Sequence, residues 1–405
     1  MKEMAPFRLL ISREEAMNII LDSIKPIERT EWVLIEEASG RVLAEDYVAD
    51  RDVPPFDRAA MDGYAVKAED NYAATSINPK ILTLIDVLHA GDSSSKSLGK
   101  DECIQIATGC PIPEGADAVV MVEFTEASNG KISVFRPVYP RANISPRGED
   151  MKKGEIIFRK GEQLTPAKIG VMAAIGRRKV FVYQKPKVAI IPTGTEICDV
   201  GSELKDGQIY DVNSYTLSSL LTENGAQVTK SSIVPDSYQE IASAITSLID
   251  HDMIIFSGGS SVGEKDLLSG VVRDLGRVLF HGVQIKPGKP TLFGIVRGKP
   301  VFGMPGYPTS CLSNAYIFLV PTVRRMARLS PKVPRTVKVR LAQKIVSSSG
   351  REQFLTVKLR DGKAYPVFKQ SGDITSMAMA DGYIILPVNL DVIDEGEEVI
   401  VILFE

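Results

Sequence analysis

A glycine- and serine-rich loop at residues 257–263 is the stretch of this sequence best suited to bind an anion. It follows the apolar run Met253–Phe256, which we expect to form a buried strand, and it leads through Asp266 into a helix-like segment. Such a junction presents backbone N–H groups to a phosphate, serine hydroxyls add donors, and Asp266 could hold a metal that bridges to phosphate. The loop has neither the Lys-Ser/Thr ending of a P-loop nor glycines spaced as G-x-G-x-x-G. From this loop alone, a plain strand-to-helix turn is equally consistent with the sequence.

Carboxylates stand at three junctions where a predicted strand gives way to a polar loop. Glu196 follows the run Val188–Ile191, Asp236 follows Val228–Val234, and Asp266 closes the glycine-rich loop. Taken singly, each is explained best as a helix cap or a first-turn charge. In a parallel sheet the three junctions converge on one edge, where carboxylates and backbone N–H groups suit a Mg²⁺-bound phosphate ester. The set therefore favours Glu196, Asp236 and Asp266 as metal ligands.

A short basic turn, KPGKP at Lys286–Pro290, offers the complementary charge. Its prolines and glycine restrict the backbone, so Lys286 and Lys289, three residues apart, could face one anion. A solvated turn with exposed lysines is the alternative. Pro305 and Pro308 frame one more glycine-bearing junction after another apolar run.

Two segments of the N-terminal half, Pro55–Ala65 and Asn143–Asp150, mix acids, aromatic residues and small residues without a clear period. Irregular polar segments at a domain border often form sites, but linkers are the simpler explanation from the residues alone. The histidines His89, His251 and His281 lie apart from any candidate nucleophile, so we expect ordinary surface or core histidines.

Strands and helices alternate between residues 185 and 330, which predicts a doubly wound, parallel α/β sheet. The expected helices cover 213–223, 237–249 and 309–329, the first of them with Asn213 or Ser214 as its cap. The expected strands cover 188–191, 228–234, 253–256 and 301–304.

Short apolar runs separated by turn residues predict small mostly-β modules before and after this α/β region. Asn129-Gly130 is a candidate hairpin turn, and Ser12 with Glu15 is a candidate capping box for a helix up to Ile24. We expect four domains: residues 1–49 with 147–184, an inserted mostly-β domain at 50–146, the α/β domain at 185–330, and a C-terminal β domain at 331–405.

The composition is that of an ordinary globular protein and excludes several function classes. A net charge of -3 does not suggest a nucleic-acid binder. The four cysteines, which are widely spaced, do not form a local zinc or iron–sulfur motif. No run is long and apolar enough to span a bilayer, and no signal peptide is evident, so we expect a cytoplasmic protein without membrane or nucleic-acid partners.

Several segments together resemble the molybdopterin molybdenumtransferase family, the MoeA-type enzymes related to the E domain of gephyrin. The matching motifs run in family order along nearly the whole chain: PFDRAAMDGYA (Pro55–Ala65), ATGCPIPEGADAVVMVE (Ala107–Glu123), RGED (Arg147–Asp150), PTGTE (Pro192–Glu196), DGQIYDVN (Asp206–Asn213), SGGSSVGEKD (Ser257–Asp266) and KPGKP (Lys286–Pro290).

The resemblance implies an elongated four-domain homodimer whose first domain serves as linker and dimerisation domain. It implies a Mg²⁺-dependent enzyme that inserts molybdate or tungstate into adenylylated molybdopterin and releases AMP, with possible contact to the molybdopterin adenylyltransferase. Sites would form between the α/β domain of one subunit and the N-terminal domains of the other. Catalytic positions carried over are Asp62, Thr108, Asp150, Glu196, Asp236 and Asp266, and substrate-binding positions are Gly258, Gly259, Ser260, Ser261, Lys286, Lys289, Pro305 and Pro308.

Three positions depart from the family pattern, and all lie in the expected anion region. The family usually has a Pro-Gly-Asn-Pro turn, and this chain has Pro-Gly-Tyr-Pro, with Tyr307 in place of the asparagine. Where the family often has a lysine four residues before KPGKP, this chain has Gly282. Where the family has three basic residues before Gly-Glu-Asp, this chain has Ser145–Arg147, of which only Arg147 is basic. Two alternatives to the transferase stay open at this point: a pterin-binding scaffold without catalysis, and a nucleotide-ester hydrolase on the same fold.

Overall fold

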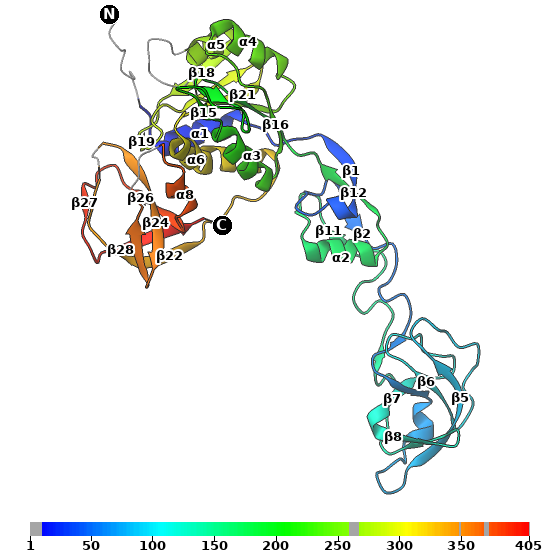
Figure 1. Ribbon diagram of the computed structural model, residues 1–405. Coiled ribbons are helices and arrows are strands. Elements are labelled where there is room, and N and C mark those ends of the chain that lie inside the picture. Colours follow the sequence, from blue (N-terminus) through cyan, green and yellow to red (C-terminus); the bar gives the residue numbers. More distant parts are fainter. Residues whose placement is uncertain (1–9, 259–266, 348–349, 368–371, 405) are drawn as a thin grey trace, which may run out of the picture. The chain divides into compact units, whose positions relative to one another are not determined.

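The chain divides into two compact units in a computed structural model that describes residues 10–258, 267–347, 350–367 and 372–404 (Figure 1). Unit 1 comprises Met1–Glu31, Gly40–Val42 and Val182–Glu405, and unit 2 comprises Trp32–Ser39 and Leu43–Phe181. The division into four domains stays a prediction.

A six-stranded sheet forms the centre of unit 1, in the order β16-β13-β17-β21-β20-β18. Its members are β16 (Gln227–Lys230), β13 (Lys187–Pro192), β17 (Met253–Ser257), β21 (Lys299–Met304), β20 (Leu292–Val296) and β18 (Gly276–His281). The first four strands are parallel, as predicted from the alternation of strands and helices.

The prediction of a wholly parallel sheet is wrong at one edge, where β20 and β18 run antiparallel. Strand β20 is joined to β21 by only Arg297 and Gly298, both with positive φ (47° and 79°). A two-residue turn of this kind makes a hairpin and cannot make the crossover that parallel strands need.

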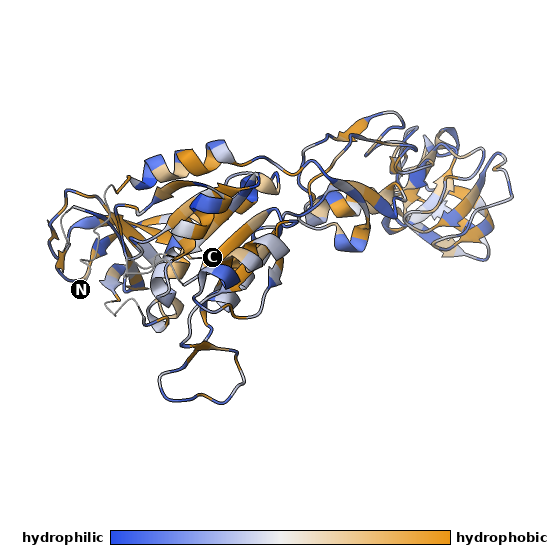
Figure 2. Cartoon of the chain, turned by 90° about the horizontal axis from the view of Figure 1, so that it is seen from above, coloured by the Kyte–Doolittle hydropathy of each residue, from blue (hydrophilic) through white to orange (hydrophobic). Residues whose placement is uncertain are grey.

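Both faces of the sheet are covered, so its strands are buried on both sides. In β17, Met253 and Ile255 belong to one core cluster, while Ile254 and Phe256 belong to the other. Helices α1 (Arg13–Ser23) and α3 (Asn213–Glu223) cover the first face, and α4 (Tyr238–Ser247) and α5 (Leu267–Leu275) cover the second. The strands are correspondingly hydrophobic in Figure 2, and the helices carry a polar side.

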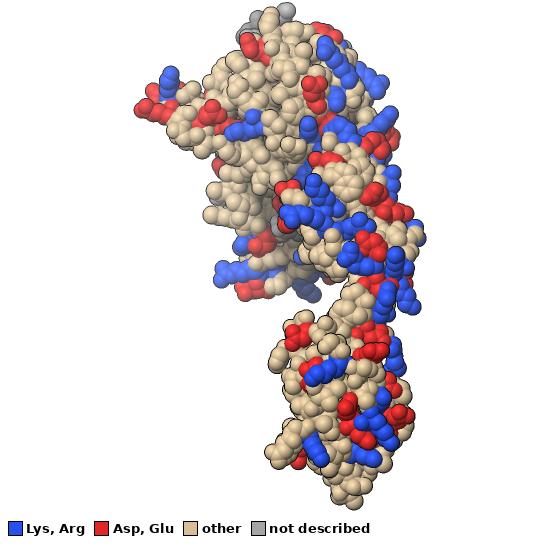
Figure 3. All heavy atoms as spheres, turned by 90° about the vertical axis from the view of Figure 1, so that its right-hand side faces the viewer, with Lys and Arg blue, Asp and Glu red and all other residues tan. Residues whose placement is uncertain are grey.

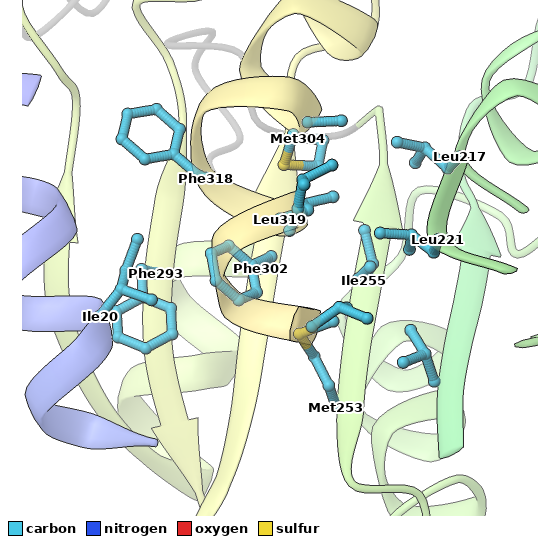
Figure 4. Packing of buried hydrophobic residues seen from close by; sticks show 14 of the residues in the cluster. Ile20, Leu217, Leu221, Met253, Ile255, Phe293, Phe302, Met304, Phe318 and Leu319 are labelled. Carbon is cyan, nitrogen blue, oxygen red and sulfur yellow. The ribbon is translucent and has the colours of Figure 1, made fainter. Parts of the chain in front are cut away.

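Figure 4 shows the packing on the first face. Apolar side chains from the helices pack there against apolar side chains from the strands. The labelled helix residues are Ile20, Leu217, Leu221, Phe318 and Leu319, and the labelled strand residues are Met253, Ile255, Phe293, Phe302 and Met304.

The helix expected at 309–329 is interrupted. It forms α6 (Pro308–Asn314), a π-helical turn (Ala315–Leu319) and α7 (Val320–Met326). Pro321 has no amide hydrogen for the regular ladder, which explains why the α-helical pattern cannot continue unbroken.

Other local predictions are confirmed. Ser12 Oγ accepts a hydrogen bond from the Glu15 amide at 3.1 Å and caps α1. Helix α3 covers the expected residues, but neither Asn213 nor Ser214 caps it; its start is fixed by Asp211, whose carboxylate accepts from the Ser214 amide at 3.0 Å. That correction follows from the N-terminal geometry of the helix, which begins one residue after Val212.

The C-terminal part of unit 1 is a small closed β structure. Strands β24 (Glu352–Arg360), β25 (Lys363–Pro366), β22 (Thr336–Leu341), β28 (Glu398–Leu403) and β26 (Gly382–Leu386) pair in that order, and β26 pairs back with β24. Strand β19 (Ile285–Lys286) joins the same sheet and pairs Lys286 with Gln353. The lysine turn is thereby attached to the C-terminal sheet.

Unit 2 contains a mixed sheet in the order β7-β4-β6-β5-β9-β8. Its strands are β7 (Ala118–Met121), β4 (Gly63–Val66), β6 (Glu102–Ile106), β5 (Lys80–Leu88), β9 (Lys131–Val134) and β8 (Thr125–Ser128). Asn129 and Gly130 form the predicted hairpin turn, with φ of 51° and 73°. Helix α2 (Pro166–Ala174) begins at Thr165, which caps it.

Short strands complete the fold: β1 (Thr30–Leu34), β2 (Tyr47–Val48), β3 (Arg58–Ala59), β10 (Ile144–Ser145), β11 (Ile156–Phe158), β12 (Lys179–Tyr183), β14 (Ile197–Cys198), β15 (Ile209–Tyr210), β23 (Ile345–Val346) and β27 (Val392–Ile393), together with helix α8 (Thr375–Ala378). On the face shown in Figure 3, basic and acidic side chains are interspersed, without a field of one sign. Among the described residues, no helix is long and apolar enough to cross a membrane.

Candidate functional site

A pocket of about 1810 Å³ lies in unit 1, where the parallel strands β13, β17 and β21 end. Loops that follow these strands line one side, and residues of the C-terminal β structure line another. The predicted site residues that line the pocket are Glu196, Asp236, Gly258, Lys286, Lys289, Pro305 and Pro308. The carboxyl edge of the parallel strands therefore gathers acids, lysines and bare backbone in one cavity.

Two carboxylates, Glu196 and Asp236, share the acidic side of the pocket. Both side chains are exposed to solvent in the open pocket. Partial burial by the surrounding protein raises the pKa of Asp236, and the nearby Glu196 charge raises it further, while the Thr193 hydroxyl acts in the opposite direction. The Glu196 charge is thus close enough to disfavour ionisation of Asp236, and a cation bound beside Asp236 would offset that repulsion.

Gly258 supplies bare backbone between the strand ends. Its φ is +101°, and a Cβ at this position would lie 2.4 Å from the carbonyl oxygen of Thr193. Its amide donates to the Met304 carbonyl at 3.3 Å, which ties the end of β17 to the end of β21. A side chain at this position would collide with the Thr193 backbone, so the position requires glycine.

The rest of the glycine- and serine-rich loop, including the predicted site residues Gly259, Ser260, Ser261 and Asp266, lies outside the described residues.

The lysine turn is held from beneath by a buried amide. Asn314 Nδ2 donates to the Gly288 carbonyl at 2.8 Å and to Thr291 Oγ1 at 2.6 Å. Thr291 Oγ1 also donates to the Gly288 carbonyl, at 3.0 Å. Gly288 has φ of +104°, and a Cβ there would meet the Asn314 amide at 2.3 Å. Lys286 and Lys289 are thus presented from a turn whose backbone is fixed.

Several pocket residues were not predicted as site residues. Asp211 is buried, and its burial raises its pKa. Asn213 Nδ2 donates to the Gly306 carbonyl at 2.8 Å and holds the turn after β21. Arg351 and Phe354 line the pocket from the C-terminal β structure. The sequence offered a signal for the first pair, a polar junction at 211–213, but none for the second, because those residues reach the pocket only through tertiary packing.

Three predicted site residues lie in unit 2. Asp62 accepts two hydrogen bonds from Thr108, one from its amide and one from its hydroxyl, both at 2.7 Å. These bonds lower the pKa of Asp62. Asp150 is exposed, and its amide donates to the Val53 carbonyl at 3.0 Å. Asp62 and Thr108 therefore form a local pair, and a role for all three in the reaction stays a prediction.

The described part of the chain contains no group of three or more His, Cys, Asp or Glu residues placed to hold a metal ion. Glu196 and Asp236 are the pair of predicted ligands that the structure describes. Two carboxylates are a sufficient protein contribution for Mg²⁺, which commonly keeps water ligands and completes its shell with substrate phosphates.

Comparison with known proteins gives consistent matches along the chain. Three family models match: "MoeA N-terminal region (domain I and II)" at residues 11–176, "Probable molybdopterin binding domain" at 189–325, and "MoeA C-terminal region (domain IV)" at 338–404. A molybdopterin molybdenumtransferase of Staphylococcus epidermidis is 32% identical over 405 residues, covering 98% of this chain and 96% of that protein.

Archaeal relatives match as well. A Methanocaldococcus jannaschii protein whose name refers to molybdopterin biosynthesis is 37% identical over 401 residues, with 96% of each chain covered. The crystal structure of a molybdopterin biosynthesis MoeA protein from Pyrococcus horikosii superposes with a TM-score of 0.83 at 41% identity, and covers 98% of this chain and 100% of that one.

The α/β sheet with its acid- and lysine-lined pocket, together with the small β structures of the same chain, defines a multidomain protein of the α/β class. The chain belongs to the MoeA family of molybdopterin molybdenumtransferases, enzymes of molybdenum cofactor biosynthesis. The resemblance inferred from the motifs is confirmed, and so are the fold class and the assignment as an enzyme.

Proposed function

We propose that this chain inserts molybdate, or tungstate, into adenylylated molybdopterin with the help of Mg²⁺ and that AMP is released in the reaction. One observation carries the proposal: the carboxylates of Glu196 and Asp236 face the same pocket as Lys286, Lys289 and the bare backbone at Gly258. The pocket therefore offers a place for a cation, a place for negative oxygens and enough volume for a substrate of this size.

The acidic side fits Mg²⁺ on its chemistry. Asp236 and Glu196 supply carboxylate oxygens, the ligand type that Mg²⁺ prefers, and the raised pKa of Asp236 shows that its ionised form lacks a compensating positive charge among the described residues. When bound, Mg²⁺ would neutralise phosphate oxygens of the adenylate and favour departure of AMP. Glu196 and Asp236 would be its protein ligands, and Asp266 is proposed as a third from its position in the sequence.

The remaining groups act by position and charge. Lys286 and Lys289 would neutralise the oxyanion or a phosphate, and the hydrogen bonds beneath them fix the backbone from which both side chains extend. The Gly258 backbone permits close approach of the substrate because no side chain stands there. In this proposal none of these groups acts as a nucleophile and no covalent intermediate forms on the protein; the rate gain comes from orientation and charge stabilisation.

We also propose a homodimer and, with it, a contribution of Asp62, Thr108 and Asp150 from unit 2 to a site completed by the partner subunit. The support is the family resemblance of the motifs that contain these residues. Contact with a molybdopterin adenylyltransferase, which would deliver the adenylated pterin, belongs to the same proposal. Sedimentation equilibrium tests the dimer, and a purely monomeric chain would contradict it.

The central test is AMP release from adenylylated molybdopterin with Mg²⁺, measured with molybdate, with tungstate and with neither. We expect release that depends on an oxyanion and stops when EDTA removes the metal. Release without any oxyanion would contradict the transferase and favour a hydrolase. Binding of the pterin without release would favour a scaffold.

A further inference from the structure

Tyr307 lies at the position where this chain departs from the family's Pro-Gly-Asn-Pro pattern, and it presents an aromatic ring to the pocket. Its side chain is 66% exposed, and it lines the pocket together with its neighbours Gly306 and Pro308. No core cluster among the described residues includes this ring. A large aromatic side chain held at the surface of a pocket is material for ligand contact.

The turn that carries Tyr307 is rigid. Asn213 Nδ2 donates to the Gly306 carbonyl at 2.8 Å, and the Tyr307 carbonyl accepts from the Cys311 amide at 2.8 Å. Pro305 and Pro308 fix the backbone on either side. A ring on such a turn loses little conformational freedom when a ligand stacks on it, because its backbone is already ordered.

The ring has a backbone neighbour on one side, and the residue before it adjoins Gly258. A Cβ at Gly372 would lie 3.6 Å from Tyr307 Cδ1, so the bare backbone of the C-terminal β structure stands close to the ring. In the other direction, Gly306 adjoins the anion-side backbone, since a Cβ there would lie 3.7 Å from Gly258 Cα. Tyr307 thus stands next to the backbone where a phosphate would be held.

We propose that Tyr307 is a stacking platform for a flat nitrogen heterocycle of the substrate, joined to a phosphate that lies toward Gly258. The identity of the substrate rests on the proposed function, under which two such rings are available, the pterin and the adenine. Tyr307 is then a specificity-determining residue peculiar to chains that lack Asn at this position. A flat ring gains stacking contact on the aromatic face, which an asparagine cannot supply.

The test compares wild type with Tyr307→Phe, Tyr307→Ala and Tyr307→Asn in calorimetric titrations with AMP, neopterin and inorganic phosphate. We expect Tyr307→Ala and Tyr307→Asn to weaken binding of one ring-bearing probe about tenfold, since stacking of a base on an aromatic side chain is of that order. Tyr307→Phe should stay within about twofold of wild type, because it keeps the ring. Loss for AMP alone assigns the adenine to the platform, and loss for neopterin alone assigns the pterin.

Tyr139 is a matched control, since its ring is 69% exposed and it does not belong to the pocket lining among the described residues. Tyr139→Ala should leave all three affinities unchanged. Equal losses for inorganic phosphate and the ring-bearing probes would overturn the proposal, because Tyr307 would then act through the shape of the turn. Unchanged affinities in Tyr307→Ala, or a wild-type chain that binds neither ring, would overturn it too. These binding measurements do not depend on transfer activity, so they fail separately from the proposed function.

Discussion

At the scale of single residues, Asp236 is a carboxylate whose proposed role in the reaction comes without a gain in folding stability at neutral pH. Burial and the Glu196 charge raise the pKa of Asp236, so its ionised form is disfavoured in the folded protein relative to the unfolded chain. The associated stability is present at low pH and is lost as the pH rises through the raised pKa. The ionised Asp236 side chain therefore does not stabilise the fold at neutral pH, which agrees with the proposed role in binding a cation.

We predict that Asp236→Asn abolishes AMP release while the free energy of unfolding at neutral pH stays equal to wild type or rises. The amide removes the charge that burial and Glu196 disfavour, and the difference between the two proteins should shrink as the pH falls through the raised pKa of Asp236 and vanish below the unfolded-state pKa of about 4. Urea unfolding at several pH values, together with the AMP assay, measures both effects. A variant that is active, or that unfolds more easily at pH 7, would contradict the prediction.

Asp62→Asn is a useful contrast because the pKa of Asp62 is shifted in the opposite direction from that of Asp236. The Thr108 amide and hydroxyl lower the pKa of Asp62, so its ionised form stabilises the fold above the unfolded pKa and that contribution is lost in acid. The asparagine variant should therefore be no more stable than wild type at neutral pH.

At the scale of elements, one helix supports the lysine turn. Asn314 belongs to α6 and is fully buried, and its amide nitrogen holds both Gly288 and Thr291. We predict that Asn314→Ala lowers the free energy of unfolding by about 1–3 kcal/mol, the usual cost of leaving buried polar groups without partners. It should also raise the oxyanion concentration needed for half-maximal AMP release, because Lys286 and Lys289 lose their support.

Ser313→Ala provides the control for this prediction. Ser313 is as deeply buried as Asn314, but its hydroxyl donates only to the Ser310 carbonyl within the helix, at 3.2 Å. We expect a smaller loss of stability and an unchanged oxyanion requirement. Equal oxyanion requirements in the two variants would show that Asn314 does not position the lysines.

How far the sequence predicts the fold depends on whether the signal is local. The Ser12 cap, the Asn129-Gly130 hairpin and helix α3 were predicted because each is set by neighbouring residues. Strands β18 and β20 were missed, since their apolar runs are short and the Arg297-Gly298 turn was not recognised. The supporting role of Asn314 was invisible, because its partners are more than twenty residues away in the sequence.

At the scale of the whole molecule, an ion pair between a partly exposed arginine and a buried aspartate anchors the N-terminal segment to the central sheet of unit 1. Arg29 donates from Nη1 and Nη2 to the two carboxylate oxygens of Asp252, at 2.9 and 2.7 Å, and Asp252 also accepts from the Lys187 amide at 2.8 Å. Burial would raise the pKa of Asp252, but Arg29, the Lys187 amide and Lys299 together hold it below its usual value. The carboxylate therefore stabilises the fold above the unfolded pKa, and that stability is lost in acid.

We predict that Arg29→Ala lowers the free energy of unfolding by about 1–2 kcal/mol at pH 7, because Asp252 is buried and loses two charge-assisted hydrogen bonds but keeps the Lys187 amide and Lys299, and because solvent screens the exposed Arg29 side. The loss should diminish as the pH falls below about 4, where Asp252 becomes protonated. Arg360→Ala is the control, since its pair with Asp361 is exposed on both sides. A pH-independent loss in Arg29→Ala, or an equal loss in the control, would argue against this account.

Gly258 also limits how this enzyme can change over generations. Any side chain at this position would collide with the Thr193 carbonyl, so no single substitution there preserves the junction of the strand ends. At the neighbouring Gly306 a Cβ would lie 3.7 Å from Gly258 Cα, an ordinary van der Waals contact, so a small side chain fits there. Substitutions that change substrate preference can therefore occur in the wall of the pocket at residues 306 and 307, whereas residue 258 must remain glycine.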